Sequence, residues 1–444
     1  MIMSKPVVAV VGRPNVGKST LFNRLVGRRV SIVEDTPGVT RDRIYADTEW
    51  RGIPFVLIDT GGIDSSSDEI IPSQMRAQAD IAIETADVIV FIVDGKAGLT
   101  SADLEVGEML QKRSKNVILV VNKADTAKLP DSYYDFYELG LGDPLPVSAA
   151  NMLGLGDLLD RITESFPEKN EEDEDTDDIK IAVIGRPNTG KSSLVNAVTG
   201  EERVIVSDIA GTTRDSIDLP FEYDDQKYTL IDTAGIRRKK NISENIEKYS
   251  VIRSISAIER SDVCVLMIDA TEGVTEQDKK IGGMAHEAGK GVIIAVNKWD
   301  LVTKDSHTMG KFERKVRAEL SYMPYAPILF ISAVKGQRLL NVLVMARAVA
   351  EHRALRVPTG QLNAVMEDAM MMRQPPSDKG KQLKIYYVTQ VGVKPPLFSF
   401  QVNKRSLMHF SYSRYLENKL REAFDFSGTS VKFVFREKGE KNID

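Results

Sequence analysis

The chain contains the same glycine-rich sequence twice, and this repeat constrains the fold more than any other feature. The first copy, Gly12-Arg-Pro-Asn-Val-Gly-Lys-Ser19, follows the apolar run Val7–Val11 and precedes an apolar pattern typical of a helix. The second, Gly185-Arg-Pro-Asn-Thr-Gly-Lys-Ser192, follows the apolar run Ile181–Ile184. Both match G-x-x-x-x-G-K-[ST], whose glycines let backbone N–H groups face phosphate oxygens. Because both copies also share Arg-Pro-Asn between a strand and a helix, chance is a negligible explanation.

Further motifs repeat in the same order. A shift of 173 residues superposes Asp59-Thr-Gly-Gly62 on Asp232-Thr-Ala-Gly235, and Thr40 on Thr213. Asn122-Lys-Ala-Asp125 matches Asn297-Lys-Trp-Asp300 at a shift of 175, and Ser148-Ala149 matches Ser332-Ala333 at 184. Small length changes between ordered motifs indicate two copies of one domain with variable loops.

Each copy alternates short apolar runs with amphipathic stretches. In the first copy the runs are Val7–Val11, Phe55–Ile58, Val88–Val93, Val117–Val121 and Leu145–Val147. The second copy has Ile181–Ile184, Tyr228–Ile231, Val263–Ile268, Val292–Val296 and Ile328–Ile331. Such runs predict an α/β domain with a mostly parallel sheet covered by helices on both faces. The motifs follow strands, where sheets of this kind bind ligands.

The phosphate-side residues predict nucleotide and Mg²⁺ binding. Lys18 and Lys191 have the position that reaches the β- and γ-phosphates. We expect Mg²⁺ ligands at a hydroxyl of the glycine loop, a later threonine and an aspartate after a strand. These are Ser19, Thr40, Asp59, Ser192, Thr213 and Asp232. The N–H groups of Gly62 and Gly235 can contact a γ-phosphate.

Asn-Lys-x-Asp after a buried strand predicts recognition of guanine. The carboxylate of Asp125 or Asp300 can accept hydrogen bonds from guanine N1–H and N2–H₂, and adenine lacks that donor pair. Lys123 and Lys298 can lie along the base plane. Ser148-Ala149 and Ser332-Ala333 would offer a backbone N–H to the guanine oxygen.

The nucleotide-binding residues expected in the first copy are Gly12, Arg13, Pro14, Asn15, Val16, Gly17, Lys18, Ser19, Asp59, Thr60, Gly61, Gly62, Ile63, Asn122, Lys123, Ala124, Asp125, Ser148 and Ala149. Those in the second copy are Gly185, Arg186, Pro187, Asn188, Thr189, Gly190, Lys191, Ser192, Asp232, Thr233, Ala234, Gly235, Ile236, Asn297, Lys298, Trp299, Asp300, Ser332 and Ala333. The catalytic candidates are Asn15, Lys18, Thr40 and Gly62, with Asn188, Lys191, Thr213 and Gly235.

Composition and charge predict three domains. Of 444 residues, 42% are hydrophobic and 28% charged, as in soluble globular proteins. We expect the two repeated domains at 1–167 and 179–357, separated by the acidic linker 168–178, and a third domain at 358–444. Since no apolar run approaches about 20 residues and no leader is visible, a cytoplasmic location is expected. The single cysteine, Cys264, lies in an apolar run and should be buried.

The third domain is basic, with 14 Lys and Arg residues against 9 Asp and Glu residues in 361–444. The pattern predicts a helix over 362–373, whose methionines should fill a core. Strands at 383–390 and 397–402 follow, then a helix from a cap at Ser406 to Phe424 and a strand at 431–435. The order α-β-β-α-β resembles a KH-type RNA-binding domain. The G-x-x-G clamp of such domains is absent, which favours docking on structured RNA or protein.

Both repeats resemble the translation-factor class of small GTPases. Two such domains followed by this module resemble, over essentially the whole chain, the EngA (Der) family of bacterial ribosome-assembly GTPases. The resemblance implies hydrolysis of GTP to GDP at two sites, linked to assembly of the large (50S) ribosomal subunit and controlling ribosome binding. It implies rRNA and ribosomal proteins as partners; we expect a monomer that binds neither DNA nor membranes. A slowly hydrolysing scaffold, or a tRNA-modification or membrane-associated GTPase, are alternatives.

Both copies depart from Ras-type domains at one position. Ile63 and Ile236 stand where a water-orienting glutamine is usual. In GTPase families that carry an asparagine at Asn15 and Asn188, it is linked to K⁺ beside the phosphates, so the resemblance implies K⁺ stimulation. The alternative is a turn residue. Arg41 and Arg214 are candidates for internal arginine fingers or for positioning, and the run 237–240 for an RNA contact or a solvated loop.

Overall fold

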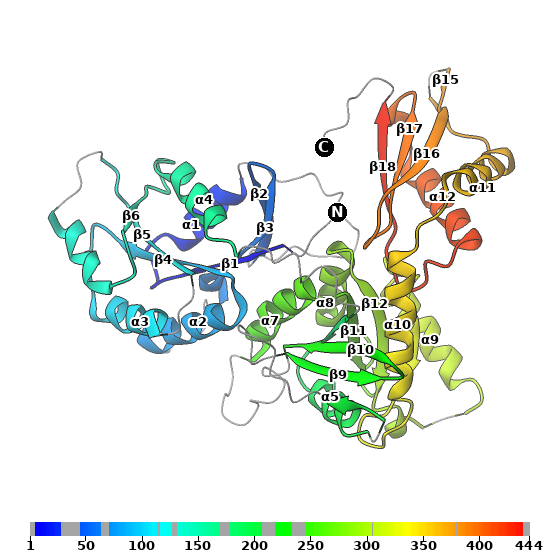
Figure 1. Cartoon of the computed structure of the whole chain (residues 1–444), viewed down its shortest axis with the longest axis horizontal. Helices are drawn as coiled ribbons and strands as arrows, with labels where there is room; N and C mark the ends of the chain where they lie inside the picture. Colours follow the sequence, from blue (N-terminus) through cyan, green and yellow to red (C-terminus); the bar gives the residue numbers. More distant parts are fainter. Residues whose placement is uncertain are drawn as a thin grey trace. The chain divides into compact units, whose positions relative to one another are not determined.

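The computed structural model describes residues 5–27, 45–63, 71–112, 116–126, 131–167, 178–201, 203–206, 218–232, 246–303, 305–378 and 380–437. They form two compact units (Figure 1). The amino-terminal unit contains the described residues of 4–176 and 243–259. The carboxy-terminal unit contains those of 177–242 and 260–444.

The sheet of the amino-terminal unit has six strands in the order β2-β3-β1-β4-β5-β6. They are β1 (Val7–Val11), β2 (Tyr45–Trp50), β3 (Ile53–Asp59), β4 (Val88–Asp94), β5 (Asn116–Asn122) and β6 (Leu145–Pro146). All pairs are parallel except β2 with β3, so the expected mostly parallel sheet is confirmed. Arg51 and Gly52 join β2 to β3 with φ values of +48° and +83°. A two-residue turn with positive φ matches the strand twist, which explains the glycine.

Helices α1 (Lys18–Val26), α2 (Ile71–Thr85), α3 (Ser101–Lys112) and α4 (Leu155–Glu164) flank this sheet, with 3₁₀ turns η1 (Thr60–Ile63) and η2 (Asp131–Leu139). These helices lie on the sheet because each has an apolar face to bury, as helix α4 illustrates. Its apolar residues Leu155, Leu158, Leu159 and Ile162 share one helical face, and all four are buried. That face packs with α1 and the strand residues in one hydrophobic core. The core therefore holds the strand ends and the start of α1 in register.

The carboxy-terminal unit repeats the arrangement in a seven-stranded sheet of order β13-β12-β11-β7-β10-β9-β8. Its strands are β7 (Ile179–Ile184), β8 (Ile205–Val206), β9 (Leu219–Tyr223), β10 (Gln226–Ile231), β11 (Val263–Asp269), β12 (Gly291–Asn297) and β13 (Ile328–Phe330). All pairs are parallel except β8 with β9 and β9 with β10. Asp224 and Asp225, both at positive φ, make the β9–β10 turn.

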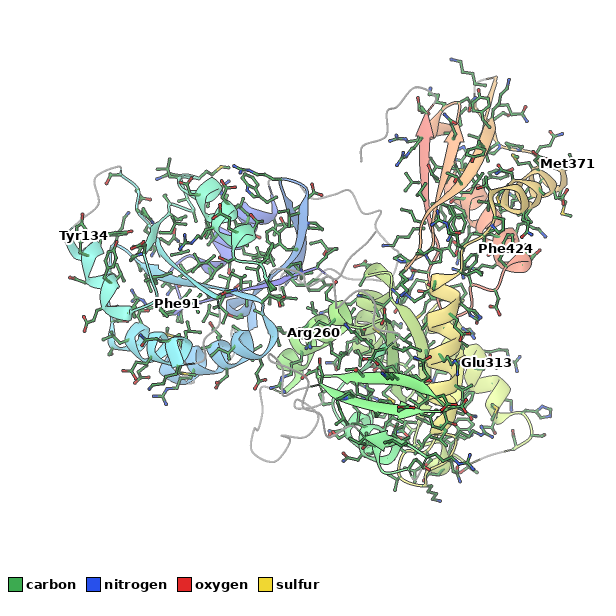
Figure 2. The ribbon with its side chains drawn as sticks, in the orientation of Figure 1. Phe91, Tyr134, Arg260, Glu313, Met371 and Phe424 are labelled. Carbon is green, nitrogen blue, oxygen red and sulfur yellow. The ribbon has the colours of Figure 1, made fainter. Side chains whose placement is uncertain are left out.

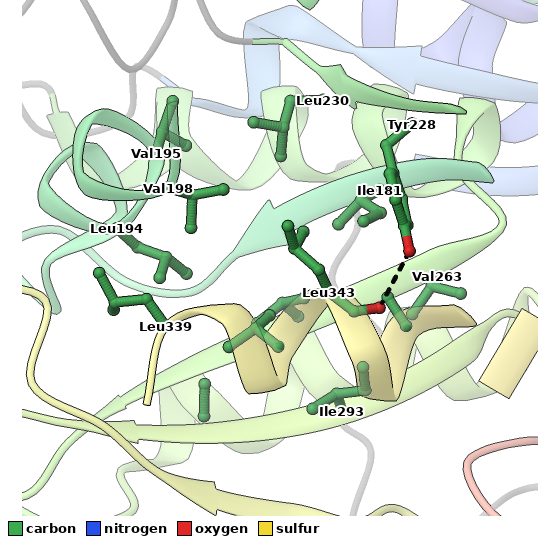
Figure 3. Close-up of a cluster of buried hydrophobic side chains, with 14 of the residues drawn as sticks. Ile181, Leu194, Val195, Val198, Tyr228, Leu230, Val263, Ile293, Leu339 and Leu343 are labelled. Carbon is green, nitrogen blue, oxygen red and sulfur yellow. Dashed lines mark hydrogen bonds between the residues drawn. The ribbon is translucent and has the colours of Figure 1, made fainter. Parts of the chain in front are cut away.

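Helices α5 (Lys191–Thr199), α8 (Glu276–Glu287), α9 (Thr308–Glu319) and α10 (Leu340–Ala354), with η4 (Trp299–Leu301), belong to this unit. Helix α7 (Ile246–Arg260) groups, up to Glu259, with the amino-terminal unit. Figure 3 shows α10 packed on the sheet, with the Tyr228 hydroxyl donating to the Leu343 carbonyl at 3.5 Å. Cys264 is fully buried in β11, as expected.

The C-terminal module has the predicted α-β-β-α-β order. It consists of α11 (Thr359–Met372), β16 (Ile385–Gly392), β17 (Leu397–Val402), α12 (Phe410–Ala423) and β18 (Lys432–Glu437), with a short β14 (Ser377–Asp378) and β15 (Lys381–Gln382) hairpin. The expected cap at Ser406 is wrong, since Ser406 lies inside η5 (Arg405–Leu407) and the helix follows His409. The methionines are only partly core: Met366 is buried, whereas Met371 and Met372 are exposed. Met371 is labelled in Figure 2.

The fold class is thus two α/β GTPase-type domains and a KH-like α+β module. The module meets the second sheet within one unit, because Val292 N–H donates to the Gly428 carbonyl at 2.7 Å. No helix among the described residues is long and apolar enough to cross a membrane.

Candidate functional site

Both glycine loops adopt a conformation that their residue types explain. Gly17 and Gly190 have φ values of +99° and +97°, which a side chain tolerates poorly. A Cβ on Gly12 would collide with the Ile92 carbonyl. Asn15 and Asn188 also lie in the left-handed region, at φ +64° and +65°, which asparagine adopts more readily than most residues.

The loop lysines fold back over their own loops. Lys18 Nζ donates to the carbonyls of Gly12 and Arg13 at 2.6 and 2.8 Å. Lys191 Nζ makes the same bonds to Gly185 and Arg186, at 2.6 and 2.7 Å. The ammonium groups are therefore held at the mouth of each loop, where phosphate oxygens can replace or join the carbonyl acceptors.

The residues expected to hold Mg²⁺ lie together in the first site. Ser19 Oγ donates to Asp59 Oδ2 at 2.8 Å, and the other carboxylate oxygen accepts the Gly61 N–H at 2.9 Å. A hydroxyl beside a carboxylate is a donor set that fits Mg²⁺, which takes oxygen ligands. Thr60 has a different function, because its buried hydroxyl donates to the Val10 carbonyl and ties β3 to β1.

The asparagines of Asn-Lys-x-Asp brace both sites from inside. Asn122 Nδ2 donates to the Val16 carbonyl at 2.7 Å, and Asn122 Oδ1 accepts the Ala149 N–H at 3.0 Å. Asn297 does the same with Thr189 and Ala333, at 2.8 and 2.9 Å. One side chain therefore links the glycine loop to the Ser-Ala segment in each copy.

This brace bears on the predicted contact with a guanine oxygen. The N–H groups of Ala149 and Ala333 are bonded to asparagine side chains, and Ser148 N–H donates to the Leu153 carbonyl. Each asparagine is the last residue of a strand, β5 or β12, which brings its amide oxygen to the alanine N–H. The contact with guanine stays a prediction, in which a guanine oxygen joins or replaces these acceptors.

Asp125 is arranged as an ionised acceptor. Lys96 Nζ pairs with its Oδ2 at 2.6 Å, and the Ser148 hydroxyl donates to its Oδ1 at 2.7 Å. The hydrogen bonds from Lys96 and Ser148 hold the pKa of Asp125 below its usual value. Because the side chain is only partly buried, a ligand can compete for both oxygens.

The base-side lysines do not point freely outward. Lys123 Nζ donates to Asp94 Oδ2 at 2.6 Å and to the Asn15 carbonyl at 2.9 Å. Lys298 Nζ donates to Asp269 Oδ2 at 2.5 Å. Trp299, in the variable position of the motif, is buried with its ring centroid 4.4 Å from that of Phe330, so it packs rather than reads a base.

Sequence reasoning missed two acidic residues in each site, four in all. Asp94 and Asp269 end β4 and β11, and Asp103 and Asp278 lie in the first turns of α3 and α8. The signal was present, because both pairs obey the same shift of 175 that relates Asn122 to Asn297. Asp-x-x-x-Gly-x-Thr-x-x-Asp is a further repeated motif.

Several expected site residues lie outside the described residues. They are Thr40, Arg41, Thr213, Arg214, Thr233, Ala234, Gly235, Ile236 and the run 237–240. Of the linker, 168–177 also lies outside. Gly62 and Ile63 close the turn η1, directly after Asp59.

Comparison with known proteins agrees with this geometry. A family model described as a 50S ribosome-binding GTPase matches residues 7–123 and again 180–298. A model described as the C-terminal KH-domain-like part of EngA bacterial GTPase enzymes matches 356–436.

Full-length relatives are also similar. The GTPase Der of Alkaliphilus metalliredigens is 62% identical over 440 residues, 99% of this chain and 100% of the relative. The GTPase Der of Clostridium novyi is 58% identical over 438 residues, with 99% and 100% covered. Among solved structures, Aquifex aeolicus Era bound to GDP and AlF₄⁻ has 19% identity and a TM-score of 0.31, covering 74% of this chain and 93% of that one.

Proposed function

The chain belongs to the GTPase Der family, and from this premise we propose that it hydrolyses GTP at two sites and acts in assembly of the 50S ribosomal subunit. That it is a GTPase, acting on GTP and usually with Mg²⁺, follows from the family. The number of working sites, the particular subunit and the control by nucleotide are the proposal.

The observation that carries the two-site proposal is the duplicated brace. Asn122 and Asn297 each join a glycine loop to a Ser-Ala segment through two hydrogen bonds of 2.7–3.0 Å. Both loops also hold their lysine in the same way. The duplication supports two nucleotide sites because the same loop geometry, lysine position and link to the Ser-Ala segment are built in both copies.

In each site the lysine, Lys18 or Lys191, binds the β- and γ-phosphates. Mg²⁺, when bound, neutralises phosphate charge; Ser19 with Asp59, or Ser192 with Asp232, would hold it together with Thr40 or Thr213. Gly62 and Gly235 offer N–H groups to the γ-phosphate. Asp125 and Asp300 read guanine.

We assign K⁺ stimulation to Asn15 and Asn188. Both side chains are exposed in left-handed loop positions. The structure gives neither side chain a hydrogen bond to another described residue. The alternative, in which the asparagine stabilises the turn by bonding its backbone, would require such a hydrogen bond. An amide oxygen in that position can help hold a cation beside the phosphates, where positive charge stabilises the transition state.

The test compares binding to 50S particles in GDP and in a non-hydrolysable GTP analogue. We expect co-sedimentation to depend on the nucleotide, and Lys18→Ala and Lys191→Ala to reduce that dependence separately. Equal co-sedimentation in both nucleotides would contradict control by nucleotide state. No binding to 50S in either, with binding to 30S, would contradict the choice of subunit.

A nucleotide-dependent scaffold is the second candidate, since Ile63 and Ile236 cannot orient water. Steady-state turnover in K⁺ separates the two. Turnover that stays at the level of the spontaneous reaction in both K⁺ and Na⁺ would favour the scaffold.

A further inference from the structure

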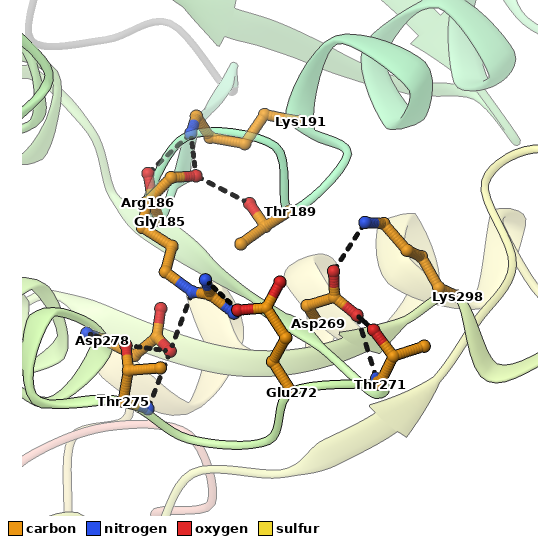
Figure 4. Close-up of polar contacts among 10 residues, drawn as sticks. All are labelled: Gly185, Arg186, Thr189, Lys191, Asp269, Thr271, Glu272, Thr275, Asp278 and Lys298. Atoms are coloured by element: carbon orange, nitrogen blue, oxygen red, sulfur yellow. Dashed lines mark hydrogen bonds and ion pairs between the residues drawn. The ribbon is translucent and has the colours of Figure 1, made fainter. Parts of the chain in front are cut away.

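The repeated Asp-x-x-x-Gly-x-Thr-x-x-Asp motif forms one connected structure in each copy. In the carboxy-terminal unit it runs from Asp269, at the end of β11, to Asp278, in the first turn of α8. Figure 4 shows Arg186 of the glycine loop directed at one end of this motif and Lys298 directed at the other. The motif therefore touches the phosphate half and the base half of one site.

The phosphate-side contact uses a fully buried carboxylate. Asp278 is 0% exposed, and its Oδ2 lies 3.4 Å from Arg186 Nε. The same oxygen accepts the Thr275 hydroxyl at 2.8 Å and the Thr275 N–H at 3.0 Å. Glu272 adds a second acid, 2.6 Å from Arg186 Nη1. A buried charge without a partner is costly, so Asp278 fixes where the guanidinium can lie.

The base-side contact uses the carboxylate of Asp269, whose two oxygens accept hydrogen bonds from different residues. Asp269 Oδ1 accepts the N–H and hydroxyl of Thr271 at 2.9 and 2.7 Å, which fixes the carboxylate plane. Asp269 Oδ2 accepts Lys298 Nζ at 2.5 Å. Burial opposes ionisation, but the lysine and threonine bonds outweigh it and keep the pKa of Asp269 below its usual value.

The first site has the same construction with one difference. Asp103, also 0% exposed, lies 3.5 Å from Arg13 Nε, and Asp94 Oδ2 accepts Lys123 Nζ at 2.6 Å. Ala97 stands where the second site has Glu272, and Arg13 instead donates to the Gly98 carbonyl at 3.4 Å. The buried pair is thus common to both sites, whereas the exposed acid is not.

We propose that this motif positions the two halves of each nucleotide site: Asp103 and Asp278 hold the loop arginine, and Asp94 and Asp269 hold the base-side lysine. These four aspartates are positioning residues, which act through Arg13, Arg186, Lys123 and Lys298. The inference rests on the proposed two-site function. Preorganisation of this kind improves affinity because less freedom is lost on binding.

A single rigid loop explains why both contacts belong together. Between Asp269 and Asp278 the chain turns through Gly273 at φ +79° and enters α8 through a capping box formed by Thr275 and Asp278. The two carboxylates that contact Arg186 and Lys298 are therefore held by one short segment. The expected consequence is that damage at either end lowers nucleotide affinity without unfolding the sheet.

The test measures GDP affinity in the full-length protein that carries Lys18→Ala, so that GDP binds only at the second site. We expect Asp278→Asn to weaken GDP binding about tenfold, because the guanidinium of Arg186 loses the buried carboxylate charge that faces it at 3.4 Å. Asp269→Asn should weaken binding similarly and also reduce the preference for GTP over XTP. The matched control is Thr275→Ala, which removes the cap hydroxyl of α8 but keeps the Arg186–Asp278 pair. It should lower thermal stability about as much as Asp278→Asn and leave GDP affinity within about twofold.

Arg186→Gln keeps the proposal testable if Asp278→Asn is poorly folded, because it removes the same ion pair from the glycine loop and should weaken GDP binding by a similar factor. Where Asp278→Asn folds, the two changes together should show strongly non-additive losses of affinity. Additive losses, or equal losses in Thr275→Ala and Asp278→Asn, would overturn the inference in favour of a capping role only. Wild-type stoichiometry is measured first: one GDP per chain would refute the two-site function, whereas two per chain with unchanged affinity in Asp278→Asn would refute this inference alone.

Discussion

His286, near the end of α8, makes the carboxy-terminal unit sensitive to acid. His286 Nδ1 lies 2.6 Å from the Tyr325 hydroxyl, and the two rings stack with centroids 5.7 Å apart. Burial, together with the charges of Lys432 and Arg421, lowers the pKa of His286 to about 4 from 6.5. Tyr322 packs edge-on against the same ring, so no carboxylate compensates a proton there among these neighbours.

Proton binding determines whether acid stabilises or destabilises the folded unit. Between pH 6.5 and about 4 the unfolded chain binds the His286 proton and the folded chain does not, so stability falls as pH falls through this window. Above the unfolded pKa the residue makes no pH-dependent contribution. The full difference between the unfolded and folded pKa corresponds to about 3 kcal/mol in the free energy of unfolding. About 2 kcal/mol of this is lost between pH 7.5 and 5.

The assay uses the chain's two tryptophans. In a Trp50→Phe background, Trp299 alone reports unfolding of the carboxy-terminal unit, because its buried ring packs on Phe330. Denaturant midpoints are measured at pH 7.5 and 5 for His286 and for His286→Phe, which keeps the stacked ring but cannot bind a proton. The exposed His307→Asn is the control.

We expect His286→Phe to be less stable at pH 7.5, since the Tyr325 hydroxyl loses its partner. Between pH 7.5 and 5 its free energy of unfolding should fall by about 2 kcal/mol less than that of the parent. His307→Asn should keep the parental pH dependence. If the parent and His286→Phe lose the same stability on acidification, the histidine is not the acid-sensitive group and the reasoning is refuted.

Four further predictions concern the nucleotide sites. Asp125→Asn turns one acceptor into a donor, so GTP binding at that site should fall and XTP binding rise; an unchanged preference for GTP would disprove the assignment. Lys18→Ala should silence the first site while the second still binds one nucleotide, measured by equilibrium dialysis; loss of both without unfolding would contradict two independent sites. Asn297→Ala leaves the Thr189 carbonyl and the Ala333 N–H without a partner, and should destabilise the carboxy-terminal unit by about 2–5 kcal/mol in Trp299-detected unfolding, with no effect on the first site. Hydrolysis should be faster in K⁺ than in Na⁺, and Asn15→Ala should reduce the difference; equal rates in the unaltered protein would exclude the cation.

Much of the architecture was predictable because it follows from local patterns. A strand of continuous apolar residues, a glycine loop and a helix occupy neighbouring positions in the chain, so β1 and α1 could be read from 7–26. Repetition of the same motifs predicted that the second sheet would match the first. The antiparallel edge strand β2 was missed, because its burial alternates weakly and it is held by pairing with β3.

The contacts within the sites depend on tertiary structure. Asn122 binds Val16 across 106 positions of sequence, and the same side chain accepts the Ala149 N–H, which no local sequence pattern predicts. Whether Asp278 faces water or Arg186 likewise depends on how α8 lies against the glycine loop. From the amino-acid sequence alone one can read which residues are available and where most of the buried strands lie. Only the fold decided which buried polar group meets which partner, because a polar group withdrawn from water must bond to whatever the packing places beside it.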